Sequence, residues 1–148
     1  MAKHFFTTAE QNGIIEAIKQ AELNTSGEIR LHIEAHCKTD AYERARQVFE
    51  QLGMHATDQK NGVLFYVAYK DHKLAILGDK GIHEKVTQQF WEEEKELLRS
   101  YFKQNKYAEG LTIAINKAGE KLQAYFPYQK NDTNELSNDI SFGGGKNA

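Results

Sequence analysis

Three short polar stretches of this 148-residue chain could together hold a cation. The first, Thr25-Ser-Gly-Glu28, and the second, Asp58-Gln-Lys-Asn-Gly62, each contain one carboxylate. The third, Gly78-Asp-Lys-Gly81, adds another between two glycines. Carboxylate, amide and hydroxyl oxygens are ligands that suit calcium and magnesium better than zinc. We therefore expect a divalent-cation site, with calcium as the expected ion and magnesium as the other candidate, if folding brings these stretches together.

The residues of the three stretches would play different parts in such a site. The expected metal ligands are Asp79, Glu28, Asp58 and Asn61. The groove around them would be lined by Thr25, Ser26, Lys60, Gly78, Lys80 and Gly81. Glycine allows close approach of the backbone to a ligand. Gly, Asn, Asp and Ser are also common turn formers, so the alternative is that all three stretches are only turns.

The elements that must position these stretches follow from the apolar pattern. Helical spacing predicts helices over about 8–23, 40–53, 83–104 and 107–125. Strict alternation over 28–36 predicts a half-buried strand with its polar side chains on the second face. The continuous apolar run 62–68 predicts a strand buried on both faces, and 74–77 a third strand.

The order of these elements predicts which ends of the strands meet. The first two strands are joined through a helix and should be parallel, with a right-handed crossover. The short connection Lys70-Asp-His72 makes the second and third strands antiparallel. All three polar stretches then lie at one end of the sheet. The fold class is α/β, a three-layer α/β/α sandwich with a small mixed sheet and helices on both faces. Residues 1–128 form this domain, and 129–148 form a polar, flexible C-terminal tail.

Composition argues against several other classes of protein. The balance of 19 basic against 21 acidic residues does not favour a nucleic-acid binder. The single Cys37 excludes an intrachain disulfide and a cysteine-rich zinc site. On a strand, His32 and His36 would lie about 13 Å apart, too far to share a zinc ion. Neither a signal peptide nor an apolar run of membrane-spanning length is visible, so we expect a cytoplasmic protein without a membrane span.

Several ordered motifs resemble the TPM domain family, in its short soluble bacterial branch. They lie at 25–30, 52–54, 60–64, 75–82, 90–91 and 109–111, and the similarity covers about residues 6–136. The resemblance implies an α/β/α sandwich with a divalent-metal site, typically for calcium, in a groove of strand-end loops. Longer members carry an acidic residue before Asn-Gly-Val and a Gly-Tyr-Gly after the next strand. This chain instead has Lys60 and Gly78-Asp-Lys-Gly81 there.

Two functions are compatible with these residues. The favoured one is a domain that holds calcium and recruits a protein partner without turnover. The alternative, implied by the family's frequent description as acid phosphatases, is metal-dependent hydrolysis of phosphomonoesters. A metal at Asp79 would then polarise the ester and activate water, while Lys60 or Lys80 stabilised phosphate charge. No nucleophile or general base stands out in the sequence, so no catalytic residue is assigned.

Overall fold

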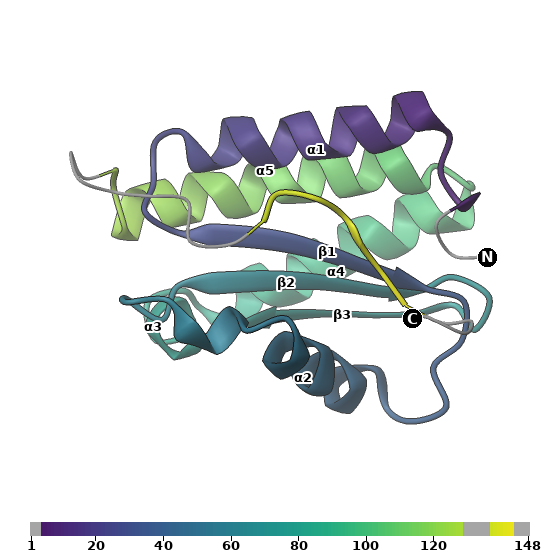
Figure 1. The fold of residues 1–148 in the computed structure, drawn as a ribbon, viewed down its shortest axis with the longest axis horizontal. Helices are drawn as coiled ribbons and strands as arrows, with labels where there is room; N and C mark the ends of the chain where they lie inside the picture. The colour runs from purple at the N-terminus through teal and green to yellow at the C-terminus, as the bar shows by residue number, and fades with distance from the viewer. Residues whose placement is uncertain (1–3, 129–136, 144–148) are drawn as a thin grey trace.

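The computed structural model describes residues 4–128 and 137–143 and shows a mixed sheet between helices (Figure 1). The sheet has the strand order β3-β2-β1-β4. Its strands are β1 (Glu28–Glu34), β2 (Gly62–Ala68), β3 (Lys73–Gly78) and β4 (Ser141–Phe142). β1 and β2 run parallel, whereas β2 and β3 run antiparallel, which confirms the predicted topology.

Helices cover both faces of the sheet. On one face, α1 (Thr8–Glu22) packs along α5 (Tyr107–Tyr125), and α4 (Gln88–Lys103) packs beside α5. On the opposite face, α2 (Ala41–Gln51) packs on β2 and β3 (Figure 1). The predicted three-layer α/β/α arrangement is confirmed. Among the described residues, no helix is both long and apolar enough to cross a membrane.

β2 is buried along its whole length, as its unbroken apolar run predicts. Val63, Phe65 and Val67 belong to the larger core under α1, α4 and α5. Leu64 and Tyr66 belong to the smaller core under α2. Successive side chains of a strand point to opposite faces, so one strand builds both cores.

The predicted helix over 83–104 is wrong in one respect, because the structure contains two helices in that region. A short helix, α3 (Lys80–His83), begins directly after Asp79. The side chain of Thr87 then caps α4, since its Oγ1 accepts a hydrogen bond from the Phe90 N–H at 3.4 Å. Two N-caps eight residues apart, Asp79 and Thr87, start two helices where apolar spacing alone indicates one. The capping box of α1, by contrast, is present, with Thr7 and Glu10 bonded at 2.9 and 3.1 Å.

The C-terminal part of the chain contributes a strand that its composition did not predict. Ser141 and Phe142 pair in parallel with His32 and Ile33 of β1. The Gly143 N–H donates to the carbonyl of Ile33 at 2.7 Å, extending this pairing. Residues 129–136 and 144–148 of the predicted flexible tail lie outside the described residues. Two paired residues are too few to produce a periodic pattern in the sequence.

The contact between α1 and α5 makes a testable prediction about stability. A Cβ added at Gly119 would lie 2.7 Å from the Cβ of Ala21, so the helices approach closely there. We expect Gly119→Val to lower the free energy of unfolding by about 1–3 kcal/mol through overpacking. In α1, nothing lies within 4 Å of a Cβ added at Gly13, and Gly13→Ala should stabilise by up to about 1 kcal/mol. Urea denaturation measures both; equal effects of the two substitutions would contradict this packing.

Candidate functional site

The three polar stretches meet at one end of the sheet, as the topology predicts. The Asp79 N–H donates to the Gly62 carbonyl at 2.8 Å, which joins the end of β3 to the start of β2. The Glu28 N–H donates to the Asn61 carbonyl at 3.4 Å, which joins β1 to the same turn. The Asn61 amide also donates to Ser26 Oγ at 3.3 Å. These bonds hold the three stretches in contact. We call this junction of residues 25–28, 58–62 and 78–81 the loop site.

The turn before β2 depends on glycine at one position. A Cβ on Gly81 would lie 2.2 Å from the Gln59 carbonyl oxygen and 2.5 Å from that of Lys60. Lys60 itself has a φ of 53°, and its ammonium donates to the His55 carbonyl at 2.6 Å. The amine of Lys60 is therefore held within its own turn, whereas Lys80 is exposed beside the loop site.

The three predicted carboxylates do not gather around one point. Asp58 is exposed. Glu28 is buried beside Glu22, and burial, together with the negative charge of Glu28, raises the pKa of Glu22 to about 8. Asp79 caps α3, because its Oδ1 accepts from the Lys80 N–H at 2.8 Å. Within residues 4–128 and 137–143, no three His, Cys, Asp or Glu side chains form a group able to hold a metal.

Two oxygens of the loop site are nevertheless left without a partner. Asn61 is only 1% exposed, and its Oδ1 is buried with no hydrogen-bond donor among the described residues. Asp79 Oδ2 is in the same situation. A buried oxygen without a donor costs about 1–3 kcal/mol, so such atoms usually face water or a ligand. Asn61 directly precedes β2 and Asp79 directly follows β3, so both belong to the same junction.

Three further residues predicted to line the groove have structural roles. The Thr25 hydroxyl donates to the Phe126 carbonyl and accepts from the Gly27 N–H at 3.0 Å, which ties the first stretch to the end of α5. Gly78 lies under Trp91, because an added Cβ would be 3.1 Å from the indole Cζ2. Ser26 Oγ accepts from Gln59 as well as from Asn61, so this hydroxyl is also engaged.

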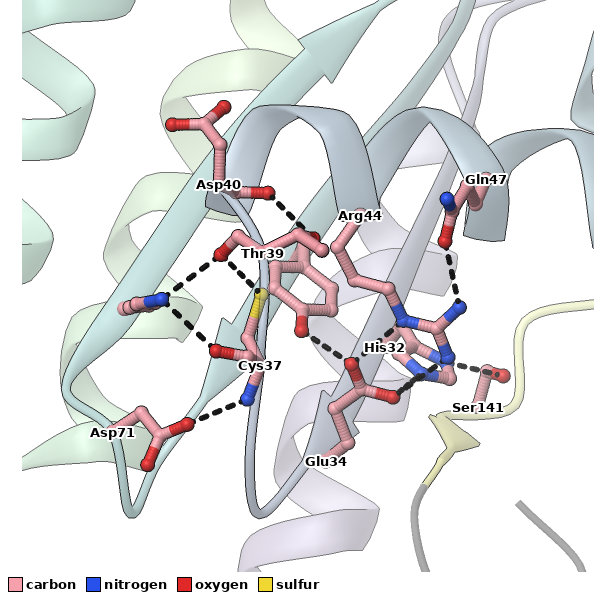
Figure 2. Close-up of polar contacts among 11 residues, drawn as sticks. His32, Glu34, Cys37, Thr39, Asp40, Arg44, Gln47, Asp71 and Ser141 are labelled. Carbon is pink, nitrogen blue, oxygen red and sulfur yellow. Dashed lines mark hydrogen bonds and ion pairs between the residues drawn. The ribbon is translucent and has the colours of Figure 1, made fainter.

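A dense cluster of side-chain hydrogen bonds and ion pairs lies elsewhere, around Glu34 of β1 (Figure 2). Its carboxylate accepts from Arg44 Nε at 2.9 Å and Nη2 at 3.0 Å, and also from the Tyr66 hydroxyl. His32 Nε2 lies 3.2 Å from the same group. Burial opposes ionisation of Glu34, which is 3% exposed, but hydrogen bonds from these three side chains outweigh it and lower its pKa to about 2. The sequence showed Glu34 only as one polar position of an alternating strand.

The C-terminal segment covers this Glu34 cluster. Ser141 Oγ lies 2.9 Å from His32 Nδ1, and Figure 2 shows the Ser141 side chain directed at the imidazole from the neighbouring segment. A Cβ on Gly143 would lie 2.4 Å from both Glu34 Oε1 and His32 Nε2. The second face of β1 is therefore buried, which corrects the prediction of a half-buried strand. Because the cluster is covered and its carboxylate is fully paired, its role is to join β1, α2 and the C-terminal segment.

The comparisons with known proteins agree with this fold. The TPM domain family matches residues 2–121, which is most of the chain. The chain belongs to the TPM domain family. This TPM domain is similar to the BA42 protein of the psychrophilic bacterium Bizionia argentinensis, whose NMR structure matches with a TM-score of 0.88 and 45% identity. That match covers 95% of this chain and 97% of the other.

A second solved structure shares the fold at much lower identity. It is the N-terminal domain of the cg2496 protein from Corynebacterium glutamicum, with a TM-score of 0.63 and 13% identity. The match covers 79% of this TPM domain and 74% of the other chain. None of the curated proteins matches this chain.

The Glu34 cluster makes a prediction about stability and pH. We expect Glu34→Gln to lower the free energy of unfolding by about 2–4 kcal/mol at pH 7, because Arg44 loses its buried carboxylate partner. The folded pKa of Glu34 lies below its ordinary value of 4.5. Its contribution is therefore fully present above pH 4.5 and is lost as the pH falls through about 2.

Unfolding curves at several pH values check this prediction. The difference between wild type and Glu34→Gln should shrink steadily below pH 4.5. The matched control is Glu43→Gln, which breaks the exposed pair with Arg46 on α2 and should leave stability nearly unchanged. A difference that stays constant from pH 7 to the acid limit would contradict the role given to Glu34.

Proposed function

We propose that this TPM domain binds a divalent cation, calcium, at the loop site through Asp79 and Asn61. The observation that carries the proposal is the pair of buried oxygens, Asn61 Oδ1 and Asp79 Oδ2, that no described donor satisfies. A cation would satisfy both. One carboxylate and one amide oxygen are hard ligands that suit calcium, which completes its shell with backbone carbonyls and water.

The donor set also predicts a modest affinity. Calcium affinity rises with the number of charged ligands and the rigidity of the site. Here Asp79 would supply a single carboxylate oxygen, Oδ2, while its Oδ1 stays on the Lys80 N–H. Asp58 is exposed and Glu28 is paired with Glu22, so neither supports tight binding as the structure stands.

The role that follows is binding rather than turnover, with a protein partner recruited by the cation-loaded domain. Metal-dependent phosphatase activity is the second candidate. One observation favours it: Lys80 is exposed directly beside Asp79, where an ammonium could hold a phosphate oxygen. Lys60, the other predicted phosphate-side group, has its ammonium held by the His55 carbonyl. The binding role needs no further catalytic group and is therefore the conclusion.

Calorimetric titration with calcium tests the proposal. Asp79→Asn keeps a good N-cap for α3 but removes the charge, and should weaken calcium binding by about tenfold or more. Asn61→Asp adds a second charged oxygen and should tighten binding. Asp58→Asn is the matched control, because its side chain is exposed, and should bind as wild type does.

Two outcomes would contradict the assignment. Equal affinities of wild type and Asp79→Asn would remove Asp79 from the site. A loss of affinity in Asp58→Asn alone would move the site to the exposed turn. Release of p-nitrophenol from its phosphate ester, dependent on added metal and lost in Asp79→Asn, would instead favour the phosphatase function.

A further inference from the structure

One edge of the sheet has no neighbouring strand. β3 pairs with β2 on one side and is the outermost strand of the described sheet. The bond from the Asp79 N–H to the Gly62 carbonyl sets the alternation along this antiparallel pair. Every second residue of β3 then directs its N–H and C=O away from β2. These residues are Leu74, Ile76 and Gly78.

The free edge lies along a groove between two helices. Two adjoining hollows, of about 780 and 440 Å³, share the lining residues Asp40, Ala41, Leu74 and Arg99. Asp40 and Ala41 stand at the start of α2, whereas Arg99 belongs to α4. These two helices lie on opposite faces of the sheet (Figure 1). The six residues of β3 span roughly 20 Å, the length of a short extended peptide.

The groove is lined by positive charge, although the whole chain has a net charge of −2. On α4, Lys95, Arg99 and Lys103 recur at four-residue spacing, which places them on one helical face along the groove. Lys38 and Lys73 add two more cations, and Asp40 is the one carboxylate among the described lining residues. Lys95 and Arg99 already pair along α4 with Glu92 and Glu96 at 3.0 and 3.5 Å, but such partly exposed pairs contribute little and can be exchanged. The lining is therefore complementary to an acidic ligand.

A residue that lines this groove also has a buried donor without an acceptor among the described residues. Trp91, which is 5% exposed, lines the smaller hollow and packs on Gly78 at the end of β3. Its Nε1 is buried and has no hydrogen-bond partner among the described residues. Buried indole N–H groups usually find a partner, so an acceptor is missing beside the last residue of the free edge.

We propose that an acidic, extended segment of a partner protein binds in this groove and adds a strand to the free edge of β3. The backbone groups of Leu74, Ile76 and Gly78 would pair with the added strand. Its Asp and Glu side chains would pair with Arg99 and the lysines, and one of its carbonyls would accept from the Trp91 indole.

The edge and its charge together select this occupant over simpler ones. A second copy of the chain, paired edge to edge through β3, would bring two positively charged grooves together, which is unfavourable. A small anion would use the ammonium groups but leave the backbone edge unpaired. An acidic peptide strand pairs with both the cationic side chains and the backbone edge. Its binding does not require calcium at the loop site.

Heteronuclear NMR titration of the full chain with a synthetic peptide tests this proposal. The probe is a ten-residue peptide that alternates glutamate with valine or threonine, in calcium-free buffer. Amide signals of Lys73–Gly78 and of Lys95, Arg99 and Lys103 should shift together. The same peptide N-methylated at alternate residues cannot form backbone bonds along one edge, and it should bind at least tenfold more weakly. A peptide with lysine in place of glutamate should not bind.

Charge-reversal variants provide the second arm. Arg99→Glu combined with Lys103→Glu changes exposed side chains, so the fold should be retained, and peptide affinity should fall at least tenfold. Lys19→Glu, on an exposed position of α1, is the matched control and should bind as wild type does.

Four results would overturn the proposal. The first is equal binding of the N-methylated peptide, which would indicate charge attraction alone. The second is equal binding of a single-stranded oligonucleotide at the same amides. The third is dimerisation through β3, seen by light scattering. The fourth is no response at millimolar peptide.

Discussion

The structure depends on the complete burial of β2 between two neighbouring strands of opposite direction. All seven of its residues are buried. The one polar side-chain group that the strand brings into the cores is the Tyr66 hydroxyl, which donates a hydrogen bond to Glu34. Its pairing sets Glu28 opposite Gly62 and Gly78 opposite Val63. A slip of one residue would move its apolar side chains to the wrong faces. The meeting of the three loops is therefore a consequence of core packing.

The same constraint explains why the polar face of β1 had to be covered. Next to β2, side chains such as His32 and Glu34 lie inside the molecule, where an unpaired carboxylate would be costly. Arg44 from α2 neutralises Glu34 (Figure 2), and Gly143 of the C-terminal segment packs directly against the Glu34 carboxylate. The cluster with the most arranged hydrogen bonds is consequently a structural one. The oxygens left without a donor lie at the loop site, and the backbone groups left without a neighbouring strand lie along the edge of β3 in the described sheet.

Much of this arrangement was predictable from the sequence, because it follows from hydrophobic pattern and chain connectivity. The apolar run of β2 and the short Lys70–His72 connection were sufficient to predict the topology and the meeting of the loops. The break between α3 and α4 was missed, because Val86 continues the helical apolar spacing across it. The roles of Glu28, Asp58 and Asp79 depend on which local partner each carboxylate finds, namely Glu22, solvent and the Lys80 N–H. Side-chain packing decides which partner each carboxylate has, and residue types and spacing alone do not predict that packing.

The central claim is that a divalent cation binds where Asn61 and Asp79 meet at the end of the sheet. The most direct test is paramagnetic broadening of amide signals by trace manganese, which substitutes for calcium at oxygen sites. We expect broadening that is centred on the amides of Gly62 and of Asp79 to Gly81, extends to Ser26, and disappears in Asp79→Asn. Broadening centred on the exposed acidic residues of α4, Glu92 to Glu96, and unchanged in Asp79→Asn, would contradict it.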